Sequence, residues 1–451
     1  MICATDPLYK MPMIPQKTSI RFSFIPHYAA VLALTLAPTL AFTQGTAAPA
    51  TPTPAVNTPT PAPATPAPAA PTPAAPGTPA VGLPAASADV TMVGDLATVP
   101  APTLTAKAWL TLDANSGQII AAQNPDEKVE PASLTKLMSA YLVFEALDNK
   151  RLSMDQMVNI SEKAWKTEGS RMFVKPNTQV SVSDLIQGVI VQSGNDATVA
   201  LAEAVAGSES AFVALMNEEA ARQGLRDTHF VNSTGLPDPA HMTTVRDLAI
   251  LARNLVAKHP QSLPFYSQKE FTYNKIKQNN RNRLLWTDPS VDGLKTGHTQ
   301  SAGYCLVATA NRDGRRVVSV IVGAASDSAR TENSLKLLNW SYQNFDTIKL
   351  YDNDKPAVNA RVWEGQAENV GLGSMGPTWI TVPRGKGPSV KPVAQYTQPL
   401  IAPLKKGAKV GTVSLSLDGK VLREEPLFVL NDVQEAGFFS RMYDKVRLML
   451  Q

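Results

Sequence analysis

At the predicted start of a helix stand the residues Pro131-Ala132-Ser133-Leu134-Thr135-Lys136-Leu137-Met138. Ser133 and Lys136 are three residues apart, which is close to one helical turn, so both side chains are expected on the same face. A serine hydroxyl is a poor nucleophile near neutral pH unless a neighbouring base takes its proton. A lysine can be that base if burial or a nearby cation lowers its pKa. The pair alone has a second interpretation, a serine near a helix N-terminus beside a solvated lysine.

Two further short motifs support the catalytic interpretation. Downstream of Ser133-Leu134-Thr135-Lys136 come Ser193-Gly194-Asn195 and Lys295-Thr296-Gly297. This set, in this order, is typical of serine enzymes that recognise penicillin. With the surrounding stretches, the chain resembles the low-molecular-mass penicillin-binding proteins that act as D-alanyl-D-alanine carboxypeptidases. Those stretches are Gly235-Leu236-Pro237-Asp238, His241-Met242-Thr243-Thr244 and Val291-Asp292-Gly293-Leu294-Lys295-Thr296-Gly297-His298-Thr299. The resemblance extends from about Lys107 to the C-terminus and leaves out a Pro/Ala-rich segment before it.

The order of the predicted elements indicates an α+β fold, because strands bracket a helical middle. A β-hairpin is expected over Lys107–Asn124. The predicted helices are Ser133–Leu147, Val182–Gln192, Ala197–Ala206, Ser210–Gln223, Thr244–Ala257 and Ser328–Asn344, and the later strands are Phe271–Tyr273, Leu284–Trp286, Gly303–Ala310 and Arg316–Gly323. The resemblance implies a penicillin-recognising serine transpeptidase/β-lactamase-like domain, an antiparallel sheet flanked by helices plus a helical subdomain. The polar stretch from Val158 to Met172 is either a loop over the cleft or an ordinary surface loop.

The resemblance also implies a role for each motif residue. Ser133 attacks the carbonyl between two D-alanines and becomes acylated, while Lys136 acts as the base. Ser193 passes a proton toward the leaving amine, and Asn195 holds Lys136 or the substrate amide. The backbone N–H groups of Ser133 and His298 form the oxyanion hole. The third motif is therefore expected on an edge strand, whose free N–H side faces the cleft.

The substrate ends in a carboxylate, so its site needs fixed positive charge and hydroxyl donors. The residues expected to bind substrate are Lys295, Thr296, Gly297, His298, Thr299, Arg281 and Arg330. For each arginine the alternative is a surface ion pair. Lys295 would also disfavour a second ammonium nearby and so keep Lys136 neutral. His241 is expected to order a loop rather than to take part in the chemistry.

The N-terminal sequence predicts export. Lys17 and Arg21 precede an uncharged, mostly apolar run from Tyr28 to Ala41, which is too short for a comfortable membrane span. The next segment consists almost wholly of Pro, Ala and Thr and cannot bury a core. The predicted divisions are a signal peptide (1–41), a Pro/Ala-rich disordered linker (42–100), a D,D-peptidase catalytic domain (101–346), a small all-β domain (347–431) and an amphipathic helix (432–451).

The C-terminal segment predicts contact with a membrane surface. On a helical wheel Phe438, Phe439, Met442, Val446 and Met449 share one face, with charged residues mostly opposite. Such a helix suits the interface of a bilayer, and the alternative is a helix docked on its own domain. We therefore expect an exported protein held peripherally at the periplasmic face of the inner membrane.

Composition and spacing argue against several other classes. The net charge is only +4 and no basic block occurs, so no nucleic-acid partner is expected. Of the two cysteines, Cys3 lies in the presequence and Cys305 lies in an apolar run typical of a buried strand, which excludes an intramolecular disulfide in the mature chain. No His-x-x-x-His or paired-Cys spacing is found, so the sequence predicts no metal and no cofactor.

We therefore predict a serine carboxypeptidase that trims the terminal D-alanine from the peptidoglycan stem pentapeptide and is acylated by β-lactam antibiotics. A β-lactamase is disfavoured, because Gly194 stands where that class has Asp and no Glu-x-x-Leu-Asn motif lies between Ser193 and Lys295. A D,D-endopeptidase shares the motifs, although the appended β domain favours the carboxypeptidase. The remaining alternative, an inactive wall-binding protein, conflicts with three intact motifs.

Overall fold

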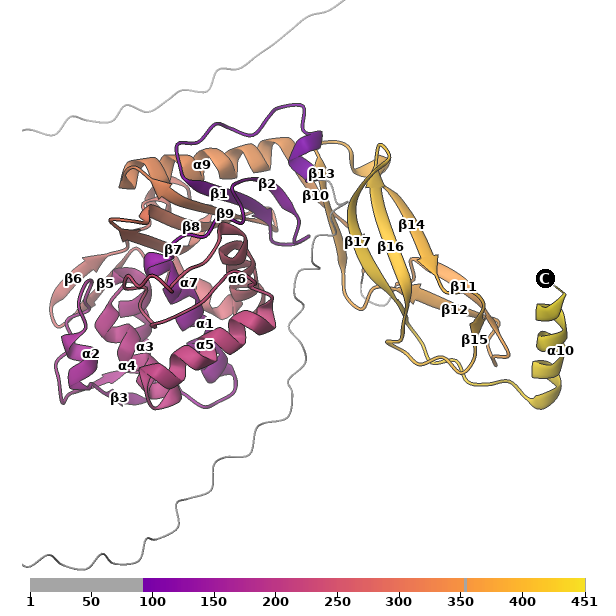
Figure 1. Cartoon of the computed structure of the whole chain (residues 1–451), viewed down its shortest axis with the longest axis horizontal. Coiled ribbons are helices and arrows are strands. Elements are labelled where there is room, and N and C mark those ends of the chain that lie inside the picture. The colour runs from indigo at the N-terminus through magenta and orange to yellow at the C-terminus, as the bar shows by residue number, and fades with distance from the viewer. Residues whose placement is uncertain (1–91, 353–354, 451) are drawn as a thin grey trace, which may run out of the picture. The chain divides into compact units, whose positions relative to one another are not determined.

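The computed structural model describes residues 92–352 and 355–450. The predicted signal peptide, Cys3 and the Pro/Ala-rich segment as far as residue 91 lie outside the described residues. Within them, an α+β part runs as far as helix α9 (Asp327–Asn344), and a set of strands with one terminal helix follows (Figure 1). The order of strands and helices agrees with the predicted α+β class.

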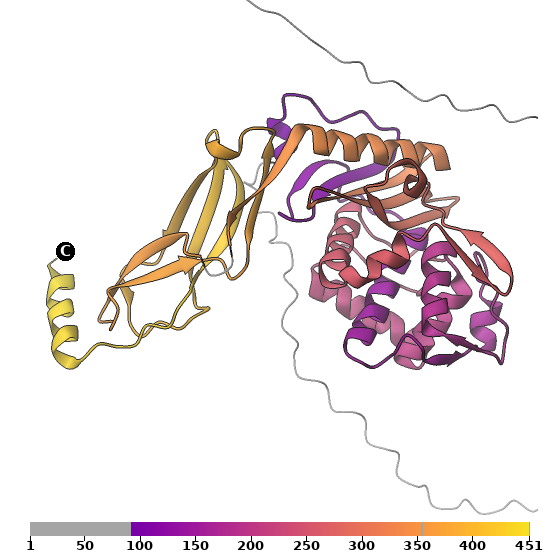
Figure 2. The same ribbon diagram turned by 180° about the vertical axis from the view of Figure 1, so that it is seen from behind.

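A five-stranded antiparallel sheet, ordered β2-β1-β9-β8-β7, forms the centre of the α+β part. Its strands are β1 (Ala108–Asp113), β2 (Ile119–Gln123), β7 (Val291–Thr299), β8 (Gly303–Arg312) and β9 (Arg315–Ala324). Helix α9 covers one face, and helices α1 (Lys136–Asp148) and α6 (Val245–Lys258) lie on the other, as both views show (Figures 1 and 2). Because helices cover both faces, β8 and β9 are almost continuously buried. The predicted hairpin is confirmed, and so is the edge position of the third motif, since β7 has β8 as its one neighbour in the sheet.

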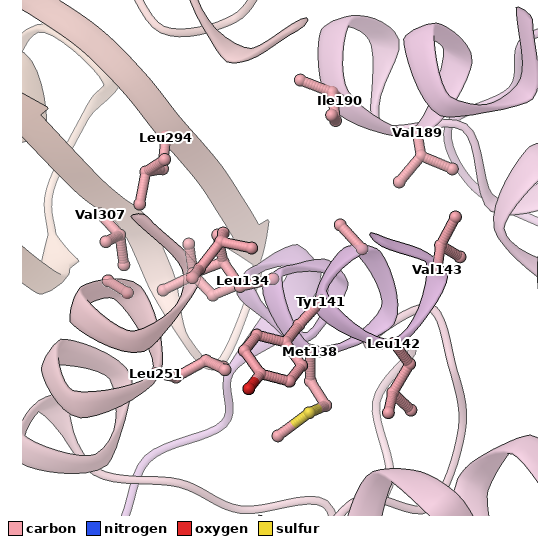
Figure 3. Packing of buried hydrophobic residues seen from close by; sticks show 14 of the residues in the cluster. Leu134, Met138, Tyr141, Leu142, Val143, Val189, Ile190, Leu251, Leu294 and Val307 are labelled. Carbon is pink, nitrogen blue, oxygen red and sulfur yellow. The ribbon is translucent and has the colours of Figure 1, made fainter. Parts of the chain in front are cut away.

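Helix α1 (Lys136–Asp148), which follows the 3₁₀ turn Ala132–Thr135, lies at the centre of the core. Ten of its residues are buried, as expected for a helix that is apolar on all sides. Figure 3 shows its Met138 and Tyr141 among side chains from other elements, including Leu251 of α6 and Leu294 of β7. The turn that carries Ser133 is therefore joined to a helix that has little freedom to move.

The helical middle of the chain lies between β2 and β7. Its helices are α2 (Glu162–Lys166), α3 (Val182–Gln187), a π turn (Gly188–Gln192), α4 (Asn195–Ala206), α5 (Glu209–Gln223), α6 (Val245–Lys258), α7 (Leu263–Tyr266) and α8 (Leu284–Thr287). Two small hairpins accompany them, β3 (Met157–Asn159) with β4 (Gln179–Ser181) and β5 (Glu270–Tyr273) with β6 (Ile276–Asn279). Serine or threonine caps start several of these helices, for example Ser208 before α5 and Thr244 before α6.

Two local predictions are wrong. Leu284–Trp286, predicted as a strand, lies in the short helix α8, whose first N–H donates to the side chain of Asn282. The predicted disordered linker ends too late, because Val93–Leu96 form a 3₁₀ helix and Val93 is only 1% exposed. Val93 packs in an apolar cluster with Trp109 and Ile120. The end of the linker is therefore held by contacts with the folded domain, which the composition of the linker does not reveal.

Strands dominate the chain after α9. β10 (Phe345–Tyr351) pairs with β13 (Thr378–Pro383), and a six-stranded sheet has the order β14-β16-β17-β12-β11-β15. Its strands are β11 (Val358–Trp363), β12 (Asn369–Gly373), β14 (Lys391–Tyr396), β15 (Leu400–Ile401), β16 (Lys409–Leu417) and β17 (Lys420–Val429). They enclose a separate apolar core with Leu372, Leu415 and Leu427 at its centre. The last element is α10 (Phe438–Met449).

No single helix among the described residues is both long and apolar enough to cross a bilayer. The bent pair α4 and α5 passes that test jointly, by length and composition only. Both helices contribute to the buried core of the α+β part.

Candidate active site

The first motif places a lysine amine beside a serine hydroxyl. Ser133 lies in the 3₁₀ turn, where residues three apart are eclipsed, and Lys136 is the first residue of α1. Lys136 Nζ is 3.1 Å from Ser133 Oγ, and the lysine is only 1% exposed. Nζ also donates to Asn195 Oδ1 at 2.7 Å and to the carbonyl oxygen of Thr234 at 2.5 Å.

The surroundings of Lys136 favour its uncharged form. Burial first, and then the positive charge of Arg281, lower the pKa of Lys136 to about 7 against the opposing effect of Asp196. A large share of this amine is therefore neutral near neutral pH, so it can accept a proton from a neighbouring hydroxyl.

The second motif lies between the π turn and α4. Ser193 is buried and adopts a left-handed backbone with φ of 66°, and its hydroxyl has no hydrogen-bond partner among the described residues. Asn195 opens α4, and its side chain bridges Lys136 and the carbonyl oxygen of Glu168, to which Nδ2 donates at 2.5 Å. The segment at Glu168 therefore lies directly against the second motif, which favours the first of the two interpretations of that polar stretch.

Asp196, which the sequence analysis did not single out, fixes this segment. Its carboxylate accepts hydrogen bonds from the backbone N–H groups of Met172, Phe173 and Val174 at 2.9, 2.8 and 3.2 Å. Asp196 is 1% exposed, so these bonds satisfy a buried charge. The sequence did offer a signal for Asp196, because it is an acidic residue at the start of a predicted helix, directly after the second motif.

The third motif lies on β7, against the 3₁₀ turn of the first motif. A Cβ at Gly297 would lie 3.2 to 3.3 Å from atoms of Leu134 and Ala132, so the two backbones approach closely because the residue is glycine. His298, next along the strand, is exposed, and its ring lies 4.1 Å from that of Tyr304. The edge strand β7 therefore lies directly beside the turn that carries Ser133.

Lys295 brings a second buried amine to the same site. It is 2% exposed, and Nζ donates to the carbonyl oxygen of Thr296 at 3.0 Å. The pKa of Lys295 is lowered well below its usual range, first by burial and then by the charge of Lys136, with smaller effects of Arg281 and Arg330. The two lysines therefore compete for protons, because each ammonium disfavours the other.

The remaining residues predicted to bind substrate differ in how far their side chains are exposed. Arg281 is exposed and Thr296 is 5% exposed. Arg330 is buried behind β7, where Nη1 donates to the carbonyl oxygens of Gly297 at 3.1 Å and Cys305 at 3.3 Å. Arg330 also pairs with Asp327, so its guanidinium supports the strand and is not a surface ion pair.

The hydroxyl of Thr299 is engaged by groups other than a substrate. It accepts a hydrogen bond from Ala302 N at 3.0 Å and lies 3.4 Å from Glu130 Oε2. Ser301 donates to the same carboxylate oxygen at 2.6 Å. Glu130 therefore links the end of β7 to the segment before Ser133, a connection that the sequence analysis missed.

His241 orders a loop, as expected. Its Nε2 lies 2.9 Å from Thr135 Oγ1, and Nδ1 accepts from Val231 N at 3.3 Å. Burial lowers the pKa of His241 to about 4, so the ring is neutral at neutral pH. Cys305 lies buried in β8, as predicted.

Comparisons with known proteins agree with this geometry. Residues 95–326 match the family of D-alanyl-D-alanine carboxypeptidases, and residues 345–435 match the C-terminal domain of penicillin-binding protein 5. The chain belongs to the D-alanyl-D-alanine carboxypeptidase family. It is a serine-type carboxypeptidase, and its fold is that of the penicillin-binding proteins.

Individual relatives cover most of the carboxypeptidase. D-alanyl-D-alanine carboxypeptidase DacC of Escherichia coli is 45% identical over 359 residues, which is 78% of this chain and 90% of the relative. Penicillin binding protein 5 from Haemophilus influenzae is 44% identical with a TM-score of 0.72, over 75% of this chain and 100% of that one. Penicillin-Binding Protein D2 from Listeria monocytogenes, solved in an ampicillin-bound form, is 33% identical with a TM-score of 0.50, over 53% of this chain and 98% of that one.

Proposed function

We propose that this carboxypeptidase removes the terminal D-alanine from the peptidoglycan stem pentapeptide through an acyl-enzyme on Ser133, and that it thereby remodels the cell wall and cell shape. One observation carries the proposal, the buried amine of Lys136 at 3.1 Å from Ser133 Oγ. Together with a pKa of about 7, this distance suits a general base for a serine nucleophile.

The contacts of Lys136 direct its lone pair. A neutral amine has two N–H groups and one lone pair, and the oxygens of Asn195 and Thr234 at this site are acceptors only. They take the two N–H groups. The lone pair then points toward the remaining neighbour, the hydroxyl of Ser133, which is the arrangement that proton removal needs.

The second lysine serves the carboxylate end of the substrate. A carboxylate placed beside Lys295 raises the pKa of that amine and keeps it charged, and a charged Lys295 in turn lowers the pKa of Lys136. Binding the correct substrate thus favours the neutral base. Thr296 and the exposed cation of Arg281 complete this end of the site, with Gly297 and Thr299 shaping the strand beneath it.

The reaction then proceeds in two steps. Ser133 Oγ attacks the carbonyl carbon of the penultimate D-alanine while its proton passes to Lys136, and the N–H groups of Ser133 and His298 stabilise the oxyanion. The proton reaches the leaving amine through the hydroxyl of Ser193, which has no hydrogen-bond partner within residues 92–352 and 355–450, and D-alanine departs. A water molecule hydrolyses the ester, returning the acyl group to solution and the proton to Ser133.

The same serine is proposed to react with β-lactams. Their strained ring presents an amide in the position of the bond between the two D-alanines, so attack by Ser133 opens the ring and leaves a stable ester. The relative solved in an ampicillin-bound form supports this extension.

We further infer that the carboxypeptidase is exported and lies peripherally on the periplasmic face of the inner membrane through α10. Phe439, Met449 and Leu450 are 88%, 85% and 82% exposed. The opposite side of the helix is engaged, since Asp444 accepts a hydrogen bond from Glu364 N at 2.8 Å. An apolar face left free while the polar face is engaged fits insertion into a bilayer interface. In this scheme residues 1–41 direct export, 42–100 form the linker, 101–346 the peptidase domain, 347–431 the small all-β domain and 432–451 the anchor.

The test measures D-alanine released from a pentapeptide ending in D-Ala-D-Ala. The parent protein should release D-alanine, and mass spectrometry after exposure to labelled penicillin should find the label on Ser133. Ser133→Ala should lose both reactions, whereas Ser161→Ala, a helix cap before α2, should keep both. A parent protein that releases no D-alanine, or that cleaves only cross-linked peptide dimers, would contradict the proposal.

A further inference from the structure

The carbonyl oxygen of Thr234 is one of two acceptors that orient Lys136, and it belongs to a loop rather than to a motif. The loop lies between α5 and α6. Within it, the side chain of Asn232 makes five hydrogen bonds to the residues from Thr234 to Leu236. Asn232 Oδ1 accepts from Gly235 N at 2.7 Å, Thr234 Oγ1 at 3.0 Å, Leu236 N at 3.1 Å and Thr234 N at 3.2 Å, and Nδ2 donates to Leu236 O at 3.0 Å. One side chain therefore closes the whole turn.

We propose that Asn232 is a positioning residue for the acylation step: by fixing the peptide between Thr234 and Gly235, it aims the Thr234 carbonyl at Lys136 and so turns the lone pair of that amine toward Ser133. This inference rests on the proposed function, in which Lys136 is the base.

Peptide geometry makes the link direct. In a planar trans peptide the C=O and the following N–H point in opposite directions. The N–H of Gly235 points at Asn232 Oδ1, at 2.7 Å, so the C=O of Thr234 must point away from Asn232. In that direction lies Lys136 Nζ, at 2.5 Å. Rotating this peptide would break both hydrogen bonds together.

The turn also lies directly against the segment that carries the nucleophile. A Cβ at Gly235 would lie 1.8 Å from the carbonyl oxygen of Ala132, and Gly235 has φ of +84°, so glycine is required there on both counts. Ser139 of α1 donates to the carbonyl oxygen of Ser233 at 2.6 Å. These contacts hold the ends of the loop in place, while Asn232 controls the orientation of the Thr234 peptide.

The loss of Asn232 should alter both the rate and the pH dependence of acylation. The Thr234 carbonyl dipole stabilises the ammonium form of Lys136 more than the amine, so a displaced carbonyl lowers the pKa of Lys136. The charged or titratable groups that also face Lys136, which are Asp196, Arg281, Lys295 and His241, are unchanged. For Asn232→Ala we therefore expect the midpoint of the pH profile of acylation to move to lower pH. The acylation rate per competent site should fall by about tenfold to a hundredfold.

Asn232→Asp should move the midpoint of the pH profile of acylation in the opposite direction. It keeps an oxygen acceptor for the four donors of the turn and places a negative charge near Lys136. That charge raises the pKa of Lys136 and moves the midpoint to higher pH. At alkaline pH the acylation rate should return to within a few-fold of the parent rate, because the carbonyl remains in place.

Asn217 provides a matched control. It is half-buried like Asn232 and makes three hydrogen bonds to its surroundings, two of them to the backbone of Phe230 at the start of the same loop. Asn217→Ala should lower the melting temperature but leave the pH midpoint and the KM for the pentapeptide unchanged. This control separates a loss of stability from a loss of orientation.

The experiment measures the second-order rate of acylation by a fluorescent penicillin across acid to alkaline pH, with competent sites counted by titration. Opposite midpoint shifts for Asn232→Ala and Asn232→Asp, at unchanged KM, would support the inference. An unchanged midpoint and rate in Asn232→Ala would overturn it, and if that variant does not fold, an unshifted midpoint in Asn232→Asp would do so. A parent protein that is not labelled at Ser133 would instead contradict the proposed function itself.

Discussion

At the scale of single residues, the site depends on two amines that are buried in one region. Lys136 and Lys295 are 1% and 2% exposed, and each lies within reach of the other's charge. Burying an ammonium is costly unless it is paired or loses its proton. Here that cost becomes useful, because it provides one amine that is neutral without strongly alkaline conditions.

The first prediction concerns pH. Acylation requires neutral Lys136, whose pKa is about 7, so the rate should be low in acid and rise through neutral pH. Penicillin labelling and peptide hydrolysis should both fall again at alkaline pH, because Lys295 then loses the charge that binds the carboxylate of either ligand. Stopped-flow labelling with penicillin and a D-alanine assay give the two profiles. A flat labelling profile between acid and neutral pH would exclude Lys136 as the base.

The second prediction concerns Lys295→Gln. The charge of Lys136 lowers the pKa of Lys295, and by reciprocity a charged Lys295 disfavours the ammonium form of Lys136. Removal of the Lys295 amine should therefore raise the pKa of Lys136 in the ligand complex and move the acylation midpoint to higher pH. The KM for the pentapeptide should rise by about tenfold or more, since a charge-assisted contact is worth about 1.5–3 kcal/mol. Lys163→Gln, in exposed helix α2, is the control and should change neither quantity. An acylation midpoint that moves to lower pH in Lys295→Gln would contradict the proposed electrostatic coupling between Lys295 and Lys136.

At the scale of elements, catalytic groups from distant parts of the chain are held together by buried polar contacts. Asp196 at the start of α4 binds three consecutive N–H groups of the segment beginning at Met172. Arg330 of α9 reaches the backbone of β7 from behind, and Glu130 holds the end of that strand. The side chain of Asn195 therefore rests on a segment that is itself fixed.

The third prediction follows from Asp196. In Asp196→Ala the backbone N–H groups of Met172, Phe173 and Val174 lose their acceptor, so the free energy of unfolding should fall by about 3 kcal/mol. The acylation rate per folded molecule should also fall, because Asn195 loses the support of that segment. Asp184→Ala removes an acidic residue from the first turn of α3 and should cost much less. Denaturant melts and penicillin labelling measure both effects; equal losses in the two variants would contradict the assigned role.

These elements also show what the sequence can and cannot predict. Ser133 and Lys136 are close in sequence, so helical geometry alone brings them together, and the edge position of β7 followed from the need for free N–H groups. The Thr234 carbonyl was missed because a backbone acceptor has no side-chain signature. The run Leu284–Trp286 was misread because a short apolar run does not distinguish strand from helix. A local hydrogen bond from Leu284 N to the side chain of Asn282 accompanies the start of the helix.

At the scale of the whole molecule, large apolar side chains that are more than half exposed gather on the last helix. Seven of the exposed large hydrophobic residues lie between Phe438 and Leu450, although the described residues extend over most of the chain. Basic residues on α10 outnumber acidic ones, with Arg441, Lys445 and Arg447 against Asp444. An apolar face beside a cationic one is suited to an anionic lipid surface.

The fourth prediction tests this surface. Phe439→Asp should weaken binding to vesicles that contain anionic phospholipid by about tenfold or more, because burial of a Phe side chain contributes about 1.5–3 kcal/mol. Phe439 is 88% exposed, so the change should leave the melting temperature and penicillin labelling intact. Val393→Asp alters an exposed apolar residue of β14 and serves as the control. Equal sedimentation of the two variants with vesicles would argue against an anchor.

The lone thiol of the described chain has a practical consequence. Cys305 is fully buried in β8, and burial raises its pKa to about 11, so it stays protonated and out of reach of maleimides. A cysteine introduced at an exposed position, such as Ile276 in the β5–β6 hairpin or Tyr443 on α10, would then be the reactive one. A spin label or fluorophore can be attached there without replacing Cys305, so the β5–β6 hairpin and the terminal helix can be followed by spectroscopy during turnover.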